Sequence, residues 1–301
     1  MKRILVTGGG GFLGGWILRR LAEDGHAVRI FDRSTDRRVL REIAGELAEQ
    51  VEWVQGDITD GAALVQAARG CSSIIHLAAL LTPACKTDPV LGAQVNLIGT
   101  LYVFAAAKAN SISQLAYASS GAVFGPDDGE RPEPLTHYGA FKLATEGCAR
   151  AYWHDDGISS VGLRPTIVYG PGRESGLTAG PTLACRAAAA GQPYTIDYSG
   201  AQDLIFVGDV AAAFAAAATK PITGAHAFSL TGGTADVTEV IAAIEAEARG
   251  AQIGFDGPTV PMAAEIARTP FEEVLGAIPQ TPLREGIART LAHYRALASA
   301  A

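Results

Sequence analysis

The chain of 301 residues lacks cysteine pairs and long uncharged apolar runs. It has four cysteines, none in a C-x-x-C pair and none with a histidine at metal-ligand spacing, which predicts no disulfide framework, no metal site and a reduced cytoplasmic protein. The first apolar run, Ile4–Val6, is too short for a signal peptide, and the Ala-rich run Val210–Thr219 is too short to span a bilayer. We therefore expect no membrane association.

Basic clusters are also missing. The formal net charge is −7, from 24 Lys and Arg against 31 Asp and Glu. The short stretch Asp36–Arg38 is the one basic segment that stands out, and it is typical of a solvated loop or the start of a helix. A nucleic-acid surface needs a basic stripe or run, so nucleic acid is not an expected partner. Hydrophobic residues make up 48% and charged residues 18% of the chain, which is typical of a globular protein with a substantial core.

Short apolar β-branched runs alternate with longer amphipathic segments in the first half of the chain. This alternation predicts parallel strands joined by crossover helices, which is an α/β fold with a Rossmann-type doubly wound parallel sheet. The expected strands are Arg3–Thr7, Ala27–Phe31, Glu52–Gln55, Ser73–His76, Gln114–Ala118 and Ser160–Arg164. The expected helices are Phe12–Asp24, Arg37–Glu49, Gly61–Ala68, Val90–Ala109 and Tyr138–His154.

The rhythm changes after residue 170, where glycine and proline become frequent. We expect an NAD-binding domain over residues 1–170 and a smaller C-terminal substrate-binding region over 171–301. Segments near 204–232 are expected to return to the main domain, namely the strand Leu204–Val207, the Ala-rich helix after it and the run Ala225–Leu230. In open α/β sheets such a region covers the carboxyl ends of the strands, where ligands bind.

A glycine-rich turn joins the first expected strand to the first helix. Its glycines Gly8, Gly11 and Gly14 have the spacing G-x-x-G-x-x-G, which allows a tight turn, a close backbone approach to pyrophosphate and close helix packing. Phe12 and Leu13 open the helix, whose free N–H groups would face the phosphates.

Asp32, at the end of the second strand, is placed to accept hydrogen bonds from the adenosine ribose. A carboxylate there repels a 2′-phosphate, which favours NAD over NADP, although Arg33 is adjacent. The alternative is a flexible glycine linker, which the flanking strand and helix disfavour.

Tyr138 and Lys142 are four residues apart on one face of an expected helix, and Ser120 follows a strand. A lysine ammonium favours the phenolate and so lowers a tyrosine pKa, and such a tyrosine can exchange a proton with a substrate hydroxyl. Ser120 would hydrogen-bond the same oxygen. With eight Tyr and five Lys in the chain, a chance Y-x-x-x-K pair has odds of about one in eight, so the pair alone is weak evidence of a catalytic site. Its position after a strand that ends in Ser119 and Ser120, downstream of the glycine turn, is what supports a catalytic role.

These motifs together resemble the extended short-chain dehydrogenase/reductase family, in its NAD-dependent epimerase/dehydratase group. The resemblance covers nearly the whole length. Beyond the glycine turn, it is carried by Gly56–Asp60, His76–Ala79, Val95–Asn96, Ala118–Gly125, Tyr138–Lys142, Arg164–Pro171 and Pro282–Ile287.

The resemblance implies roles for individual residues. Asp57 and Ile58 would hold the adenine, and Asn96 would support the active site from its helix. Lys142 would also bind the nicotinamide ribose, as a second role beside catalysis. The implied cofactor set also includes Leu77, Ala78, Ala79, Tyr138, Pro165 and Ile167, and the candidate substrate contacts are Thr82, Ser120, Gly121, Tyr138, Arg173 and Thr178. A homodimer formed by the helices Val90–Ala109 and Tyr138–His154 is implied as well.

Three departures from the family pattern bear on the substrate. Ile167 stands where nucleotide-sugar members carry an Asn, and Gln202 stands where they carry an Arg, both of which contact the substrate's diphosphate. An Ile cannot hydrogen-bond and a Gln cannot neutralise phosphate charge, so binding of a diphosphate is weakened. Gly121 and Ala122 replace the acidic pair of sugar dehydratases, which argues against dehydration.

Three functions remain in competition. The favoured one is an NAD-dependent oxidoreductase that transfers hydride at a secondary alcohol or ketone of a small sugar, sugar acid or hydroxy acid, with Arg173 or Thr178 binding a carboxylate or hydroxyl. The alternative is an NAD-dependent epimerase of a sugar or nucleotide sugar, which holds its NAD tightly and shows no net redox change. A catalytically inactive NAD-binding regulator is disfavoured because both Tyr138 and Lys142 are present.

Overall fold

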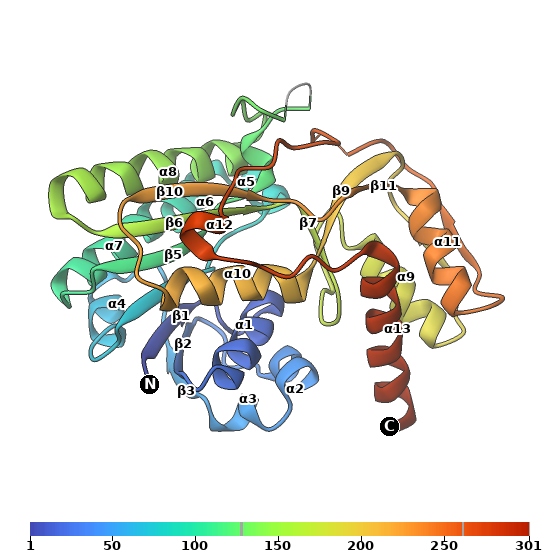
Figure 1. Cartoon of the computed structure of the whole chain (residues 1–301), viewed down its shortest axis with the longest axis horizontal. Coiled ribbons are helices and arrows are strands. Elements are labelled where there is room, and N and C mark those ends of the chain that lie inside the picture. The colour runs from blue at the N-terminus through green and yellow to red at the C-terminus, as the bar shows by residue number, and fades with distance from the viewer. Residues whose placement is uncertain (127–128, 261, 301) are drawn as a thin grey trace.

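The computed structural model describes residues 1–126, 129–260 and 262–300. Seven parallel strands form the main sheet in the order β10-β6-β5-β4-β1-β2-β3 (Figure 1). The order steps outward from β1 in both directions, which confirms the predicted doubly wound arrangement. The strands are β1 (Arg3–Thr7), β2 (Ala27–Asp32), β3 (Glu52–Gln55), β4 (Ser73–His76), β5 (Gln114–Ala118), β6 (Ser159–Pro165) and β10 (Ala225–Leu230).

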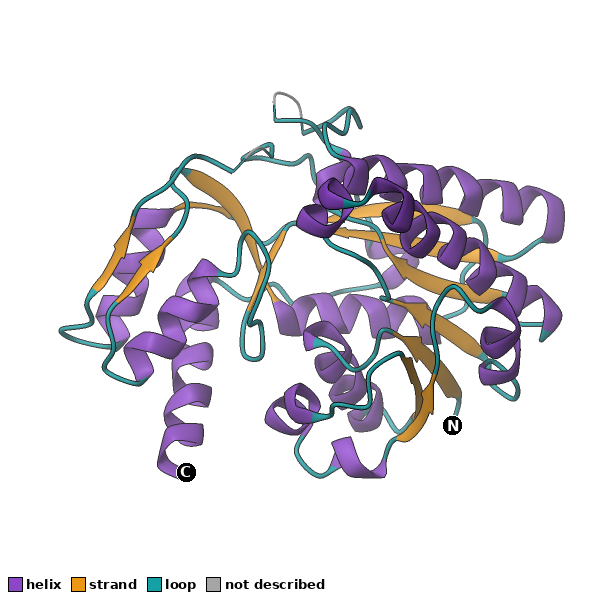
Figure 2. Cartoon of the chain, turned by 180° about the vertical axis from the view of Figure 1, so that it is seen from behind, coloured by secondary structure: helices purple, strands orange, loops and turns teal. Residues whose placement is uncertain are grey.

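Helices cover both faces of this sheet (Figure 2). One face carries α1 and α10, which contact each other, and the opposite face carries α4, α7 and α8. The bounds on the first face are α1 (Phe12–Glu23), α2 (Arg38–Ala44), α3 (Leu47–Gln50), α10 (Val207–Thr219) and α12 (Glu272–Leu275). On the second side they are α4 (Gly61–Ala67), α5 (Thr82–Thr87), α6 (Pro89–Ala93), α7 (Gly99–Ala109) and α8 (His137–Asp156).

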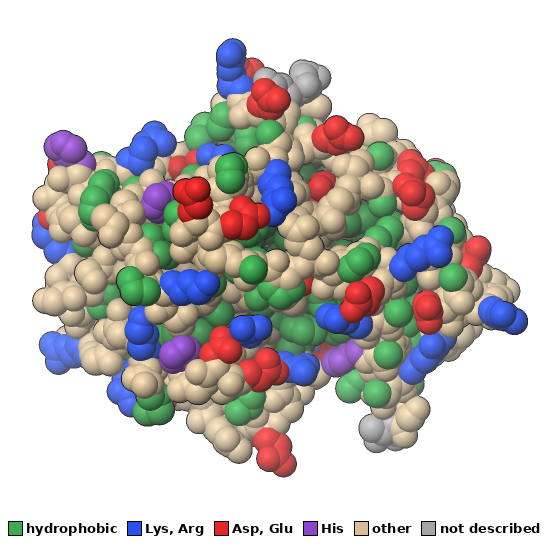
Figure 3. All heavy atoms as spheres, in the orientation of Figure 1, with side chains coloured by type: hydrophobic (Ala, Val, Ile, Leu, Met, Phe, Trp, Pro, Cys, Tyr) green, Lys and Arg blue, Asp and Glu red, His purple; other side chains and the backbone are tan. Residues whose placement is uncertain are grey.

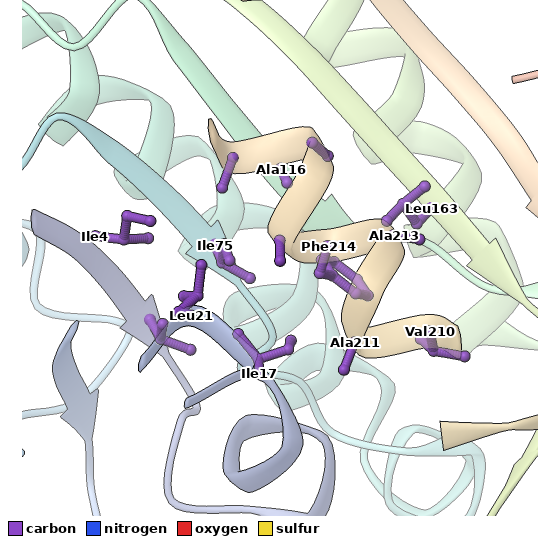
Figure 4. Packing of buried hydrophobic residues seen from close by; sticks show 14 of the residues in the cluster. Ile4, Ile17, Leu21, Ile75, Ala116, Leu163, Val210, Ala211, Ala213 and Phe214 are labelled. Carbon is purple, nitrogen blue, oxygen red and sulfur yellow. The ribbon is translucent and has the colours of Figure 1, made fainter. Parts of the chain in front are cut away.

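Alternate residues of the buried strands supply two hydrophobic cores. Ile4 and Val6 of β1 pack in the cluster on the α1 and α10 side, whereas Leu5 between them packs in the cluster on the other side. Figure 4 shows α10 lying across the sheet with Phe214 among the strand side chains. The small alanines of α10 let its backbone approach the sheet closely, and Phe214, fully buried, contributes roughly 1.5–3 kcal/mol through its burial.

A smaller lobe follows β6. Its three-stranded sheet has the order β11-β9-β7, with β7 (Ile167–Tyr169), β9 (Ala201–Phe206) and β11 (Thr234–Asp236). A second pair joins β8 (Tyr194–Ile196) to β12 (Ile253–Phe255). These strands and the helices α9 (Gly180–Ala189), α11 (Val237–Glu247) and α13 (Leu283–Ala300) enclose a third core, and in Figure 1 they lie at one end of the main sheet.

The structure differs from the sequence-based expectation at three elements. The helix expected over Arg37–Glu49 is broken into α2 and α3 by Gly45, which adopts a φ of 57°. The helix expected over Val90–Ala109 contains a π-helical turn, η1 (Gln94–Ile98), between α6 and α7. The strand expected near Leu204–Val207 belongs to the small sheet through β9, so only α10 and β10 return to the main layers.

The expectation that the chain has no long uncharged apolar run is wrong at one place: among the described residues, the segment Pro89–Ala109 is long and apolar enough to cross a membrane, judged by length and composition only. Helices in protein cores pass the same test. Here α7 packs against α4, α8 and β4, and 44% of the most apolar window is buried inside the protein.

Candidate active site

The glycine turn after β1 is constrained at its first and third glycines. Gly8 has a φ of +68°, and a Cβ there would lie 2.6 Å from the backbone nitrogen of Ala78. A Cβ on Gly14 would lie 2.2 Å from the carbonyl oxygen of Gly9. At Gly11 the nearest atom would be 3.8 Å away, so this position opens onto free space. The fold itself therefore requires Gly8 and Gly14, while Gly11 leaves room for a ligand.

The N-terminus of α1 meets the end of β2 at this turn. Gly11 is the N-cap of α1 and brings no side chain to bond the first N–H groups of the helix. One carboxylate oxygen of Asp32 accepts a hydrogen bond from the Gly10 N–H at 3.0 Å, and the other accepts one from the Ser34 N–H at 3.0 Å. A positive helix end and an oriented carboxylate thus lie beside the same turn.

A groove of about 360 Å³ runs along the carboxyl ends of β1, β2 and β4. Eight of the predicted cofactor residues line it: Gly8, Gly11, Asp32, Asp57, Ile58, Leu77, Ala78 and Ala79. The remaining lining residues are Gly10, Phe31, Arg33, Ser34, Asp36, Val39, Gly56, Leu80 and Val95. Most of this second set were not predicted, although several directly follow β2 and share its position at the sheet edge. Hydrogen bonds from the Thr59 N–H and hydroxyl lower the pKa of Asp57.

Asn96 lies in the π-helical turn η1 and is buried beside the groove. Its amide oxygen accepts from the Leu80 N–H at 2.7 Å, and its amide nitrogen donates to the Leu80 carbonyl at 2.9 Å and to the Cys85 sulfur at 3.3 Å. The side chain thus fixes the backbone of a groove residue from a neighbouring helix. π-helical turns are frequent at functional sites, and this one aims the Asn96 amide at Leu80.

Ser120, Tyr138 and Lys142 come together near the carboxyl end of β5. Ser120 is the N-cap of the 3₁₀ turn η2 (Gly121–Val123), and its hydroxyl oxygen accepts from the Ala122 N–H at 3.1 Å. Tyr138 and Lys142 lie in the first turns of α8, which begins after Thr136 caps it. The Lys142 ammonium donates to the Ala118 carbonyl at 2.6 Å and lies 5.6 Å from the centroid of the Tyr138 ring.

Burial governs the proton affinities in this cluster. It lowers the pKa of Lys142 to about 8, because the charged ammonium loses water. Burial also raises the pKa of Tyr138. A hydrogen bond with Ser120 and the positive charge of Arg173 lower that pKa, but by less. The expectation that Lys142 lowers the Tyr138 pKa is therefore wrong for this arrangement. The groups that lower it are Ser120 and Arg173, and burial outweighs both.

Two buried polar networks support the cluster from behind. His76 bonds the Thr7 hydroxyl at 2.7 Å through Nδ1 and the Thr100 hydroxyl at 3.0 Å through Nε2, and burial lowers its pKa to about 3. It is therefore a neutral core histidine. One turn beyond Lys142, Glu146 pairs with Arg164 through two hydrogen bonds of 2.7 and 2.5 Å.

The Glu146 carboxylate also accepts from the Ser119 hydroxyl at 2.6 Å. Glu146 was not singled out from the sequence. Its position on the same helical face as Tyr138 and Lys142, at i+8 and i+4, was the available signal.

Two of the candidate substrate residues, Arg173 and Thr178, lie in the segment between β7 and α9, where the small lobe begins. The Arg173 guanidinium donates to the Val168 carbonyl and, at 2.7 Å, to the Thr178 hydroxyl. Gly121 is buried, and a Cβ there would contact Ile266 at 2.9 Å and the Pro165 carbonyl at 3.5 Å.

Thr82 is the first residue of α5, directly after Leu81. His137, beside the catalytic candidate Tyr138, is exposed and stacks on Phe141 with their ring centroids 6.2 Å apart.

Not every predicted cofactor residue lines the groove. The side chain of Ile167 is buried in the core of the small lobe with Leu204, its partner across β7 and β9, and it does not face the groove. Phe12 and Leu13 pack against the same core, so only their backbone N–H groups belong to the α1 terminus. Pro165 ends β6 beside Gly121. The buried Asn96 and Lys142 and the half-buried Tyr138 do not line the groove either.

A parallel sheet of this order, with a glycine turn and a carboxylate at its switch point, defines a dinucleotide-binding protein of the Rossmann type. The cluster of Ser120 after β5 with Tyr138 and Lys142 of α8 adds side chains that are able to exchange protons. The chain belongs to the NAD dependent epimerase/dehydratase family, whose model matches residues 4–230. It is an enzyme of the extended short-chain dehydrogenase/reductase type and uses NAD, which confirms the predicted class and cofactor.

Similar proteins agree with this assignment. A UDP-glucose 4-epimerase of Mycolicibacterium smegmatis is 31% identical over 97% of this chain and 98% of its own length. A 2-alkyl-3-oxoalkanoate reductase of Stenotrophomonas maltophilia is 34% identical over 56% of this chain and 52% of its own length. The crystal structure of a Thermus thermophilus UDP-glucose 4-epimerase in complex with NAD superimposes with a TM-score of 0.83 at 28% identity, over 97% of this chain and 99% of the other.

Proposed function

We propose that the protein transfers hydride between NAD and a secondary alcohol or ketone of a small substrate that carries no nucleotide. The observation that carries this proposal is the burial of Ile167 and Gln202, at 2% and 3% exposure, in the two positions where the family pattern has diphosphate contacts. Neither side chain can neutralise phosphate charge, and both are enclosed by the core of the small lobe. This argues against a nucleotide diphosphate sugar as the substrate.

The groove residues fit NAD. Gly11 leaves open space where pyrophosphate would approach the backbone, and the uncapped end of α1 would donate N–H groups to it. Asp32 would accept the adenosine ribose hydroxyls, with Asp57 and Ile58 beside the adenine. Leu77, Ala78 and Ala79 would line the path toward the active site, where Asn96 holds Leu80 in place.

The catalytic role falls to Tyr138, which would take the proton of the substrate hydroxyl during oxidation and return it during reduction. Ser120 would hydrogen-bond the same substrate oxygen, since its hydroxyl acts on that of Tyr138 and lowers the Tyr138 pKa against the effect of burial. Lys142 would hold its positive charge below the Tyr138 ring and reach the nicotinamide ribose. NAD, when bound, supplies the acceptor or donor of the hydride.

Absorbance of NADH at 340 nm tests this proposal. The purified protein is mixed with NAD and a panel of free sugars, uronic acids, aldonic acids and small hydroxy acids, beside the variant Tyr138→Phe. We expect a signal with at least one compound and its loss by about 10²- to 10⁴-fold in the variant, the usual weight of an acid–base group. If no compound of the panel yields NADH, the proposed function is wrong.

An epimerase is the second candidate, favoured by the full-length similarity to two proteins named UDP-glucose 4-epimerase. Such an enzyme would oxidise and re-reduce one sugar carbon and keep its NAD bound. Chromatography of UDP-glucose after incubation with the protein, without added NAD, tests it. Formation of UDP-galactose that depends on Tyr138, together with a silent NADH assay, would establish the epimerase in place of the dehydrogenase.

The domain division follows from the same proposal. Residues 1–170 with α10 and β10 would bind NAD, and most of residues 171–301 would bind the substrate. We also propose a homodimer in the cytoplasm with a small molecule as its only substrate partner, as the family resemblance implies.

A further inference from the structure

Arg173 occupies the loop between β7 and α9, at the seam between the two lobes. A Cβ on Gly176 would lie 3.5 Å from one guanidinium nitrogen of Arg173 and 3.7 Å from the Leu81 side chain, so the guanidinium lies close to the start of α5. Its charge also acts on the hydroxyl groups of Tyr138 and Tyr198. Arg173 is thus a partly buried cation, held by two hydrogen bonds in the loop, whose charge acts on the hydroxyl of Tyr138.

The guanidinium is oriented by neutral groups alone. Two of its five N–H donors are used, toward the Val168 carbonyl and the Thr178 hydroxyl. Among residues 1–126, 129–260 and 262–300, no carboxylate lies within ion-pair distance of Arg173 and no other acceptor bonds it. Burial lowers the pKa of Arg173 to about 10, which still leaves it charged at neutral pH. Three donors and a positive charge therefore remain for a ligand.

Other arginines near Arg173 have carboxylate partners within the chain. Arg164, which like Arg173 is partly buried, pairs with Glu146 through two hydrogen bonds. Glu174, the residue after Arg173, pairs with Arg38 and with Arg186 and so leaves Arg173 alone. A buried charge without a partner is costly, and a fixed arginine fork matches a carboxylate in two parallel hydrogen bonds.

We propose that Arg173 binds a carboxylate of the substrate, so that the substrate class is a hydroxy acid such as an aldonate or another sugar acid. This inference rests on the proposed function, whose substrate it specifies. In the oxidation, the secondary alcohol would become a ketone: bound NAD⁺ would accept the hydride from its carbon, and the phenolate form of Tyr138 would accept its hydroxyl proton. The carboxylate stays unchanged and holds the carbinol carbon near Tyr138.

Matched pairs of acids and alcohols test the inference. Threonate, xylonate and gluconate are compared as substrates with threitol, xylitol and glucitol, which carry a hydroxymethyl group in place of the carboxylate. The variants are Arg173→Gln, Arg173→Lys and, as the control, Arg186→Gln, which removes an exposed cation that pairs with the neighbouring residue Glu174. The melting temperature of each variant shows that it folds.

We expect at least one aldonate to be oxidised at least about tenfold faster than its alditol. Arg173→Gln should raise KM for that aldonate at least about tenfold, Arg173→Lys less, and Arg186→Gln by no more than about twofold. Alditols that serve as well as aldonates, or an Arg173→Gln variant that behaves like Arg186→Gln, would overturn the carboxylate role while leaving the dehydrogenase in place.

A binding measurement separates the two proposals. Each aldonate is titrated calorimetrically into the NAD⁺-saturated Tyr138→Phe protein, with and without Arg173→Gln. If no compound yields NADH with the wild type but an aldonate binds and Arg173→Gln abolishes that binding, the proposed function fails and the carboxylate site stands. If no aldonate binds and none is oxidised, the carboxylate site is overturned, and the proposed function fails with it only if no compound of the whole panel yields NADH.

Discussion

At the residue scale, Lys142 is a positive charge that the fold buries to 3% exposure. Its ammonium bonds the Ala118 carbonyl, and within the described part of the chain it forms no ion pair. Burial lowers its pKa from 10.5 to about 8, so at neutral pH the folded protein carries a charge that would be more stable in water. Lys142 is therefore expected to cost stability in exchange for its role beside Tyr138.

Replacing Lys142 with Met, which has a similar length and no charge, tests this cost. Below pH 8 the lysine is protonated in both the folded and the unfolded chain, and the full cost is present. Between pH 8 and 10.5 the folded chain releases the proton first, so wild-type stability rises with pH, whereas Lys142→Met lacks this rise.

We expect the variant to be more stable than the wild type at pH 7, by on the order of 1–3 kcal/mol, with the difference shrinking toward pH 10. Urea unfolding at pH 7 and pH 9.5 measures it. A variant that is less stable by the same amount at both pH values would show that the Ala118 bond outweighs the burial of charge.

At the element scale, the β1–α1 turn separates the glycines that fold the chain from the glycine that leaves space for the cofactor. Gly14→Ala brings a Cβ to 2.2 Å from the Gly9 carbonyl, so it should lower the melting temperature by several degrees. Gly11→Ala meets nothing closer than 3.8 Å, so it should melt like the wild type yet bind NAD at least about tenfold more weakly, because its methyl group takes the space of the pyrophosphate. Thermal melts and calorimetric NAD titration distinguish the two. Equal loss of stability in both variants would contradict the assignment.

Much of the main sheet could be predicted because buried parallel strands are short apolar runs, and β1, β3, β4 and β5 have the predicted bounds. The interruptions of the helices were harder to predict from the sequence. Gly45 is a residue type that ends helices, and it was a usable signal, but the π-helical turn at Asn96 leaves the apolar pattern of its helix continuous. The place of β9 depends on its pairing with β7 and β11, which are distant in sequence. Periodicity carries no information on such pairing.

The same limit applies to the candidate site. Residues within one motif, such as Tyr138 and Lys142, could be placed together from helical spacing alone. Contacts between motifs could not: the Asn96 bonds to Leu80, and the proximity of Arg173 to Tyr198, arise only when the chain folds. Ile167 was assigned to the cofactor by resemblance, yet its strand turns the side chain into the core of the small lobe.

At the scale of the whole molecule, the two lobes meet at the substrate loop. Arg38 of α2 pairs with Glu174, which also pairs with Arg186 of α9, so one carboxylate links the two lobes. Figure 3 shows charged side chains of both signs scattered over one face of the molecule, without a large patch of one sign.

The proposed homodimer would bury apolar side chains that α7, α8 and η1 leave exposed. Ile98 is 39%, Tyr102 37% and Trp153 37% exposed. We expect a dimer by sedimentation equilibrium, and a shift toward monomer in the double variant Ile98→Glu, Trp153→Glu. A wild type that sediments as a monomer at micromolar concentration would remove this expectation, and a variant that stays dimeric would place the interface elsewhere.

Transfer of deuterium tests the central claim most directly. The panel compound with the highest rate is deuterated at its carbinol carbon and incubated with the protein and NAD, and the mass of the NADH formed is measured. Direct hydride transfer to an exchangeable cofactor predicts NADH one mass unit heavier than the unlabelled product, with no label in water. Unlabelled NAD in solution, with the deuterium retained in an isomer of the substrate, would contradict the account and identify an epimerase.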